Sequence, residues 1–272
     1  MDIGTSTIIL AFALTLFAGL STGVGSLLAI FTKQTNTRFL SVALGFSAGV
    51  MIYLAFAEML VESNRTLGKV LGTVPGAWAT VGGFFVGILF IAVIDRFVPE
   101  MGNPHAVHTV EEMDGKSIEH KNKLMRTGVF TAIAIAIHNF PEGIAAFMAT
   151  LIDPVLGVSV AVAVAIHNIP EGISVAVPIY YATGSKKKAF KFSLISGLAE
   201  PLGALVAFLF LYQFMSETLF ALVFAFVAGV MIYISIDELL PAAHKYGEQH
   251  LVIYGLIGGM AVMAANLLLM MK

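Results

Sequence analysis

Long apolar runs alternate with short polar segments along nearly the whole chain. Eight of the runs are long enough to cross a membrane as helices, which takes about 20 mainly apolar residues. Most of the segments between them are rich in turn-forming residues, as in KQTNTR, ESNRTLGK, TGSKKK and AAHKYGEQH. We therefore predict an all-α integral membrane protein with spans at about 6–31, 39–61, 75–98, 127–151, 154–181, 189–213, 217–240 and 250–271.

One polar segment, at about 99–126, is longer and shows no periodic apolar face, so it is predicted to be a flexible loop. It contains His105, His108 and His120 among several acidic residues. Such a composition can bind metal weakly, although a solvated linker explains it equally well. Together with this loop, residues 1–272 are predicted to form a single transmembrane domain.

Composition supports a membrane protein and narrows its chemistry. The chain is 58% hydrophobic and 12% charged, whereas soluble proteins carry roughly 25% charged residues. A net charge of −2 gives no reason to expect a nucleic-acid partner. The chain has no cysteine, so any metal site must use His, Asp, Glu, Asn, Met or backbone oxygen. The first apolar run is too long, and lacks the preceding basic residues, for a signal peptide.

Basic residues predict the orientation, because cytoplasmic loops of membrane proteins are enriched in Lys and Arg. An even number of spans places both termini on the same side. If that side is outside, 12 of the 15 Lys and Arg residues lie in cytoplasmic loops. We therefore expect both termini to be periplasmic, in a bacterial inner membrane. The twelve are Lys33, Arg38, Arg96, Lys116, Lys121, Lys123, Arg126, Lys186, Lys187, Lys188, Lys191 and Lys245.

Two halves of the chain resemble each other. AGVMIYLAFAEML, which begins at Ala48, matches AGVMIYISIDELL, which begins at Ala228, at 8 of 13 positions. A weaker match relates AGLSTGVGSLL from Ala18 to SGLAEPLGALV from Ser196. The second span thus resembles the seventh, which runs in the opposite direction, and the first resembles the sixth. We predict a 3+2+3 inverted repeat, an arrangement typical of secondary transporters, whose sites lie near the membrane midplane.

The two central spans carry the motifs AIHNFPEGI and AIHNIPEGI. Helical spacing places His138 and Glu142 on one face of the fourth span, and His167 and Glu171 on one face of the fifth. Pro141 and Pro170 are expected to kink their helices, and Gly143 and Gly172 let helices approach closely. A single intramembrane histidine more often packs or hydrogen-bonds than binds metal. Two antiparallel copies of a His-x-x-x-Glu pair favour a metal site.

Burying such groups in a membrane costs at least about 2.5–3.5 kcal/mol for each charge, which a divalent cation would offset. Imidazole and carboxylate ligands suit zinc, iron, manganese, cobalt or copper. Glu200 lies deep in the sixth span and adds a third carboxylate, unless it only hydrogen-bonds the backbone beside Pro201. Met51 offers a thioether, although core packing explains it better.

Acidic residues also end the second and seventh spans. Asp237 and Glu238, followed by His244, are expected near the cytoplasm, and Glu58 and Glu62 on the other side. They would serve as relays that pass metal out of and into the site. Helix ends that simply meet water explain them equally well.

Taken together, HNFPEG, HNIPEG, the EP of the sixth span and the His-containing loop resemble the ZIP (Zrt-, Irt-like) family of metal transporters, and most closely its bacterial members. The resemblance covers the whole chain. It implies import of zinc, and of Fe2+, Mn2+, Co2+ or Cd2+, as transported substrates, with no resident cofactor. It also implies one metal site at His138, Glu142, His167 and Glu171, and a second at Asn139, Asn168 and Glu200, bridged by Glu142 and Glu171. A homodimer is plausible on the same ground.

Two alternatives belong to other classes. An intramembrane metalloprotease would need His-Glu-x-x-His, which the sequence lacks, and would leave the inverted repeat without a purpose. A proton-coupled carrier of organic solutes would use the same His and Glu as proton relays. No G-x-x-x-x-G-K-[ST] motif is present, so transport is expected to run on ion gradients or on the membrane potential.

Overall fold

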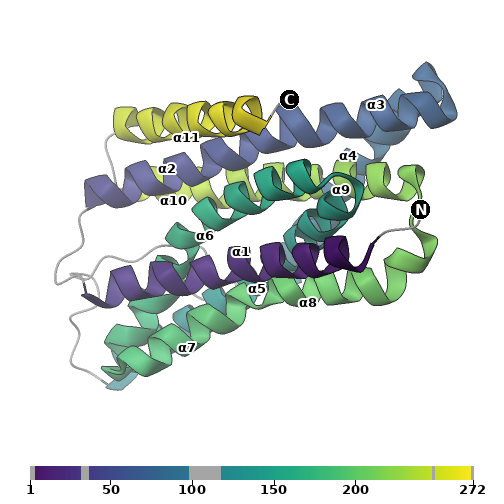
Figure 1. The fold of residues 1–272 in the computed structure, drawn as a ribbon. Helices are drawn as coiled ribbons and strands as arrows, with labels where there is room; N and C mark the ends of the chain where they lie inside the picture. Colours follow the sequence, from purple (N-terminus) through teal and green to yellow (C-terminus); the bar gives the residue numbers. More distant parts are fainter. Residues whose placement is uncertain (1–3, 32–36, 98–117, 247–248, 271–272) are drawn as a thin grey trace.

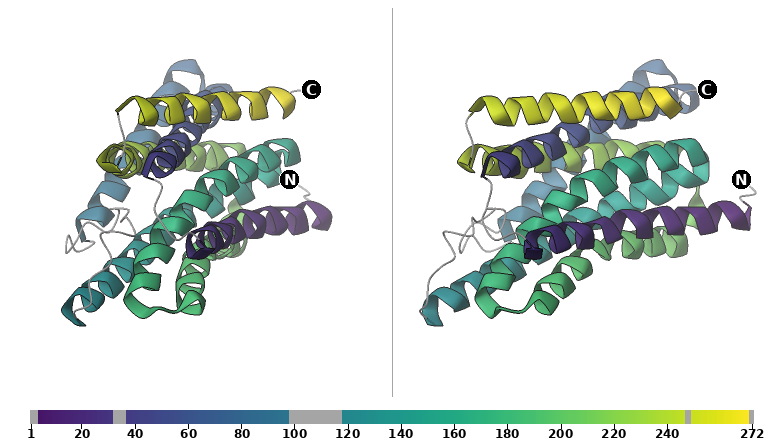
Figure 2. Two further views of the ribbon diagram at one scale, coloured as in Figure 1. Left: turned by 90° about the vertical axis from the view of Figure 1, so that its left-hand side faces the viewer. Right: turned by 60° about the vertical axis from the view of Figure 1, so that its left-hand side comes forward.

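The computed structural model describes residues 4–31, 37–97, 118–246 and 249–270, and these form helices without any strand. Eight helical stretches among them are long and apolar enough to cross a membrane, which confirms the predicted fold class. Figures 1 and 2 show them side by side, with both termini toward the same end of the bundle. The helices are α1 (Thr5–Phe31), α2 (Thr37–Leu54), η1 (Ala55–Met59), α3 (Leu60–Leu71), α4 (Thr73–Phe97), α5 (Ile118–Ile152), α6 (Pro154–Thr183), α7 (Lys186–Gly197), α8 (Ala199–Val206), η3 (Ala207–Leu211), η4 (Tyr212–Phe214), α9 (Glu217–Ile234), η5 (Ser235–Leu239), α10 (Leu240–Tyr246) and α11 (Gln249–Met270).

The second span is longer than the sequence predicts. α2, η1 and α3 follow one another without a break, so the segment ESNRTLGK is helical and its prediction as a turn is wrong. Ser63 and Thr66 of this segment are buried, and the Ser63 hydroxyl donates to the carbonyl of Ala221 at 2.7 Å. The turn comes at Gly72, whose φ of 92° is a conformation that favours glycine.

The fourth span also begins earlier than predicted. α5 starts at Ile118, so the prediction of a flexible loop at about 99–126 is wrong for residues 118–126, and residues 99–117 lie outside the described residues. The first turns of α5 have a buried side, which the sequence pattern did not indicate. Leu124 packs against Val177 of α6, whereas Lys123 is exposed.

The helices form two groups. α1, α5, α6, α7 and α8 contact mainly one another, and α2, α3, α4, α9, α10 and α11 form the second group. The groups meet where α2 contacts α6 and where α9 contacts α5. The two motif-bearing helices are therefore central, and most of their residues are buried.

Close glycine contacts recur in equivalent sets and confirm the inverted repeat. Gly172 on α6 lies against the backbone carbonyl of Thr22 on α1, and Gly143 on α5 lies against that of Glu200 on α8. Thr22 and Glu200 are 178 positions apart, which is the offset between the first and sixth spans. A Cβ at either glycine would collide with a carbonyl oxygen, so both helix contacts depend on glycine.

Equivalent glycine contacts also occur between the peripheral helices. Gly49 on α2 lies against the carbonyl of Leu256 on α11, and Gly229 on α9 lies against the carbonyl of Phe84 on α4. Gly49 and Gly229 are 180 positions apart, the offset between the second and seventh spans. The first three spans are thus equivalent to the last three, and α5 is equivalent to α6.

Two short π-helices also occupy equivalent positions. η1 (Ala55–Met59) interrupts the second span, and η5 (Ser235–Leu239), 180 positions later, interrupts the seventh. Each carries a glutamate at its fourth residue, Glu58 and Glu238. π-helical turns are rare and often lie at functional sites. Glu58 and Glu238 are thus equivalent residues of the repeat and candidate functional residues.

Candidate metal centre

The two copies of the motif meet in the centre of the bundle. His138 and Glu142 lie one turn apart on α5, as do His167 and Glu171 on α6. No more than 5% of any of these residues is exposed. Buried histidines and glutamates in a membrane need partners that offset their charge or satisfy their hydrogen bonds.

His167 joins α6 to α5. Its Nε2 lies 3.0 Å from Oε2 of Glu142, and its Nδ1 lies 3.1 Å from the carbonyl oxygen of Ala163. A carbonyl only accepts hydrogen bonds, so we assign a proton to Nδ1. The contact between Nε2 and the carboxyl group then needs one further proton. A divalent cation between the two groups would take the place of that proton.

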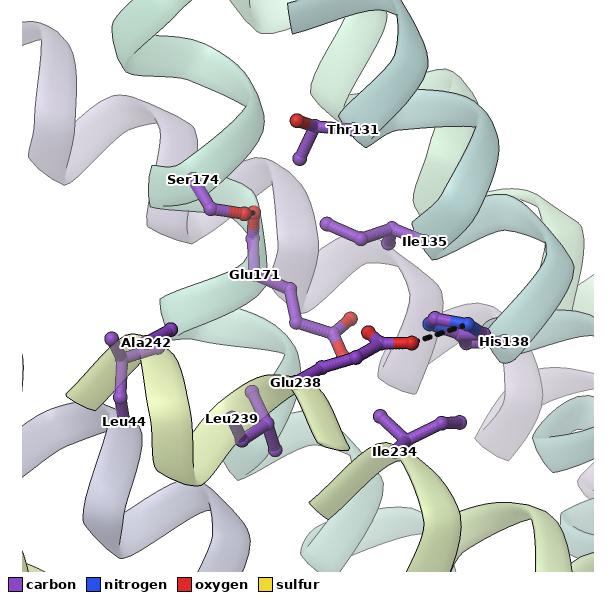
Figure 3. Close-up of a pocket in the computed structure, with 10 residues that line it drawn as sticks. All are labelled: Leu44, Thr131, Ile135, His138, Glu171, Ser174, Ile234, Glu238, Leu239 and Ala242. Atoms are coloured by element: carbon purple, nitrogen blue, oxygen red, sulfur yellow. Dashed lines mark hydrogen bonds and ion pairs between the residues drawn. The ribbon is translucent and has the colours of Figure 1, made fainter. Parts of the chain in front are cut away.

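His138 has a partner from a third helical element. Its Nε2 lies 3.2 Å from Oε1 of Glu238 on η5. Figure 3 shows the carboxyl groups of Glu238 and Glu171 side by side, with the dashed line marking the contact to His138. These residues, with Thr131 and Ser174, line a cavity of about 30 Å³, enough for a species the size of a water molecule.

The two asparagines make equivalent backbone contacts. The side-chain amide of Asn168 donates to the carbonyl of Ala18 at 3.0 Å, and that of Asn139 donates to the carbonyl of Ser196 at 3.5 Å. Asn168 also donates to the carboxylate of Glu200, which is fully buried. The expected group Asn139, Asn168 and Glu200 is therefore only partly joined, since a hydrogen bond links Asn168 to Glu200.

Four fully enclosed oxygen atoms near these contacts have no hydrogen-bond partner among the described residues. They are Oδ1 of Asn139, Oε1 of Glu142, Oδ1 of Asn168 and Oε2 of Glu200. Amide and carboxylate oxygens are acceptors, so a cation or a hydrogen-bond donor is needed to satisfy them. Oxygen ligands of this kind suit hard and borderline divalent cations. The residues present therefore fit a metal ion as cargo.

The ligands are arranged as pairs, not as one preassembled set. Among the described residues, no three His, Asp or Glu side chains are placed closely enough to hold a metal ion by themselves. Glu142 approaches His167, whereas His138 approaches Glu238. The expected grouping of His138, Glu142, His167 and Glu171 around one ion thus stays a prediction, and it requires these side chains to exchange partners.

The sequence did not identify Glu238 as part of the site. It placed Glu238 with Asp237 and His244 in a relay, but only Glu238 turns inward, with 7% of it exposed. Asp237 and His244 are exposed. The signal was available in the repeat, because glutamate occurs at the equivalent positions Glu58 and Glu238.

Glu58 lies in a separate cleft of about 480 Å³ on the terminus side of the bundle. Glu62, Arg65 and Asp153 line the same cleft. Arg65 is 2.6 Å from Oε2 of Glu62, so this carboxylate already has a cationic neighbour. Asp153 caps α6, with its carboxylate accepting from the N–H of Val155 at 2.8 Å.

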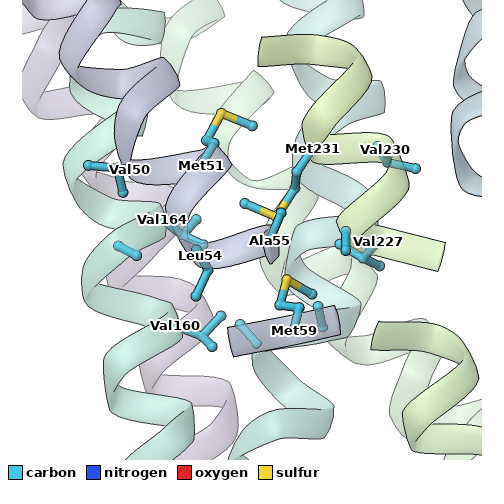
Figure 4. Close-up of a cluster of buried hydrophobic side chains, with 14 of the residues drawn as sticks. Val50, Met51, Leu54, Ala55, Met59, Val160, Val164, Val227, Val230 and Met231 are labelled. Carbon is cyan, nitrogen blue, oxygen red and sulfur yellow. The ribbon is translucent and has the colours of Figure 1, made fainter. Parts of the chain in front are cut away.

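An apolar layer separates this cleft from the candidate centre (Figure 4). Along α6, Val160 and Val164 come between Ser159, which lines the cleft, and His167. Figure 4 shows both valines near Leu54 of α2 and Met59 of η1. At most 2% of any of these four residues is exposed. Met51 is fully buried and belongs to the same apolar cluster.

His105 and His108 lie outside the described residues, as does the side chain of His120.

Comparisons with known proteins match nearly the whole chain to one family. The sequence profile of the family described as ZIP Zinc transporter matches residues 5–267. The chain is 60% identical over 264 residues to the zinc transporter ZupT of Lysinibacillus sphaericus (strain C3-41), covering 97% of this chain and 98% of that protein. It is 53% identical over 276 residues to the zinc transporter ZupT of Clostridium perfringens (strain 13 / Type A), covering 97% of each.

Proposed function

From the premise that the chain belongs to the ZIP zinc transporter family, we propose that it imports zinc into the cytoplasm. The family consists of transporters, so the metalloenzyme alternative is set aside and no catalytic residue is assigned. Zinc is the ion in the names of the relatives. Fe2+, Mn2+, Co2+ and Cd2+ are proposed as further substrates, because imidazole, carboxylate and amide ligands do not select strongly for zinc.

The proposed site comprises His138, Asn139, Glu142, His167, Asn168, Glu171 and Glu200. The observation that supports it is the set of four enclosed oxygens without a hydrogen-bond partner, on α5, α6 and α8, beside two His–Glu contacts. All four are acceptors, and a divalent cation satisfies acceptors while offsetting carboxylate charge. A carrier of neutral organic solutes would not need such a surplus of buried acceptors.

Charge supports the same proposal. Glu142, Glu171 and Glu200 are buried, and their ionised forms would repel one another strongly in a medium of low dielectric constant. One divalent ion offsets two of the three negative charges, and a second ion offsets the remainder. The ions therefore stabilise the ionised carboxylates, which otherwise need protons to remain buried.

The direction of transport rests on the predicted orientation, with both termini periplasmic. Under that orientation the inside-negative membrane potential draws cations inward. Moving a divalent ion across 100 mV releases about 4.6 kcal/mol, twice the value for one elementary charge. No ATP-binding motif is present, so we propose that the metal gradient and this potential suffice, with or without proton exchange.

Reconstitution tests the proposal. Proteoliposomes loaded with a metal-sensitive dye should show uptake of Zn2+, and of Fe2+, Mn2+, Co2+ or Cd2+, that increases with an inside-negative potential. His167→Ala is the matched control, because it removes one ligand from the proposed site. Uptake that is equal in wild type and His167→Ala, or absent for every metal, would contradict the proposal. Light scattering of the purified protein tests the homodimer separately.

A further inference from the structure

The two halves of the bundle share one scaffold but differ in their central ion pairs. The close glycine contacts recur at equivalent positions in the two halves. The asparagine contacts do so as well, because Asn139 and Asn168 donate to the carbonyls of the equivalent residues Ser196 and Ala18. The contact between His138 and Glu238 does not. Its equivalent would join His167 to Glu58. In the structure His167 instead contacts Glu142, and Glu58 lies in the cleft.

Packing differs between the two halves at the same positions. The cavity beside His138 is lined by Thr131 and Ile135 of α5. Their equivalents on α6, 29 positions later, are Val160 and Val164, which are buried in the apolar layer of Figure 4. On the second group of helices, Leu239 of η5 lines the cavity, and its equivalent Met59 of η1 belongs to the layer. The side of the centre next to His138 therefore contains a cavity, whereas apolar side chains fill the equivalent space next to His167.

In an inverted repeat, each half can adopt the conformation that the other half shows, and this exchange opens the site to the opposite side. Resting on the proposed function, we propose that Glu58 becomes the partner of His167 when the centre opens toward the cleft. Glu238 then leaves His138, and Glu171 takes the place at His138 that Glu142 now holds at His167. Glu58 is thus a positioning residue for the metal site in the second conformation.

Partner exchange explains how both conformations can keep their charges paired. In the observed state each buried histidine contacts a carboxyl group from another helix: His167 contacts Glu142 of a central helix, and His138 contacts Glu238 of a π-helix. The proposed state has the same kinds of histidine–carboxyl contact, but His138 contacts the carboxyl group of a central helix and His167 that of a π-helix. Leaving a histidine or a carboxylate buried without a partner is strongly destabilising, so two states of equal pairing can have similar free energies. Glu58 is only partly buried, and it can enter the centre once the apolar layer separates.

Cysteine cross-linking in membranes tests the geometry directly, because the chain has no cysteine. In the double variant Glu58→Cys/His167→Cys, oxidation should form a disulfide, since the two side chains come into contact when the layer opens. Glu62→Cys/His167→Cys is the control, because Glu62 lies one helical turn farther from the centre along the same span. This pair should form little or no disulfide under the same conditions. The inference is overturned if the first pair forms no disulfide in protein that reaches the membrane. It is also overturned if the first pair forms no more disulfide than the control pair.

Uptake gives a second and separate readout. Glu58→Gln should lower zinc uptake by about 10- to 100-fold, as for other residues that orient metal ligands. Asp153→Asn removes a charge from the same cleft while retaining a side chain that can cap α6, and should have a smaller effect. Equal uptake in these two variants overturns the inference even if the double variant does not fold. If wild-type protein transports no metal, the proposed function fails, whereas the cross-link can still form.

Discussion

Nε2 of His167 on α6 lies 3.0 Å from Oε2 of Glu142 on α5, so one contact joins the two central helices. The other ring nitrogen is held by the carbonyl of Ala163 in the same helix. The imidazole is therefore fixed with Nε2 toward the partner helix. Any cation that binds between these groups must displace the proton that they share.

Metal binding should therefore release protons. Titration of purified protein with Zn2+ in weak buffer should acidify the solution, because the metal replaces the proton between His167 and Glu142. For the same reason zinc affinity should fall as the pH is lowered. A pH indicator measures the release, and calorimetry in buffers of different ionisation enthalpy gives the number of protons. In Glu142→Gln the release should be smaller, and binding without any proton release would contradict the assignment.

Loss of any motif ligand should nearly abolish transport. His138→Ala, Glu142→Ala, His167→Ala and Glu171→Ala should each lower zinc uptake by more than about 100-fold, since even indirect supports of a metal site contribute 10- to 100-fold. Each substitution removes a ligand and leaves the charge of its neighbours uncompensated. Uptake should be normalised to the amount of protein in the membrane. Normal uptake in two of the four variants would exclude this site.

Glu238 should matter more than its neighbour Asp237. Glu238→Gln removes the carboxylate that contacts His138, and we expect uptake to fall by about 10- to 100-fold, as for other residues that orient metal ligands. Asp237→Asn changes an exposed side chain on the same π-helix and should have a smaller effect. Uptake assays on both variants decide this. Equal losses would indicate that charge at the helix end, and not the contact with His138, is what transport requires.

Much of the fold was predictable because the membrane restricts the choices. Apolar runs of about 20 residues can only be helices there, and the strict offset between AGVMIYLAFAEML and AGVMIYISIDELL revealed the repeat. Boundaries were less predictable. The polar segment ESNRTLGK continues the second span as a helix because Ser63 hydrogen-bonds α9, a contact between residues 158 positions apart. Such tertiary contacts leave no local pattern.

The site was predictable in its residues but not in its pairing. Helical spacing placed His138 with Glu142 and His167 with Glu171, and the structure buries all four. Helical spacing does not show which carboxylate each imidazole contacts across helices, whereas the structure pairs His167 with Glu142 and His138 with Glu238. Glu238 was missed because a π-helix changes which residues face inward, and its register cannot be read from spacing that assumes an α-helix.

Orientation in the membrane can be tested with single cysteines. A cysteine at Thr73 or at the C-terminus should react with an impermeant thiol reagent in intact cells, because both positions are predicted to be periplasmic. A cysteine at Ser117 or Ser185 should react only after the cells are lysed. The chain has no native cysteine, so background labelling is absent. The reverse pattern would contradict the orientation and the direction of transport.

Glu200 tests whether the centre holds two ions. If it ligates a second ion beside the first, wild-type protein should bind about two Zn2+ per chain and Glu200→Gln about one. The reason is charge: without Glu200, two ions with about four positive charges would face only the carboxylates of Glu142 and Glu171, and close like charges repel strongly at low dielectric constant. The variant should keep part of its transport, unlike His138→Ala. Calorimetric titration measures the number of sites.

The alternative role of Glu200 is structural, since its carboxylate accepts a hydrogen bond from Asn168. Glutamine at this position keeps an acceptor oxygen and a similar volume, so Glu200→Gln preserves much of that contact while it removes the charge. A structural role therefore predicts an unchanged number of bound ions and a loss of transport that follows thermal stability. Glu217→Gln, at an exposed position near the start of α9, is the control for the loss of a charge elsewhere and should bind zinc as wild type does. An unchanged stoichiometry in Glu200→Gln would remove this residue from the proposed ligands and leave one ion between α5 and α6.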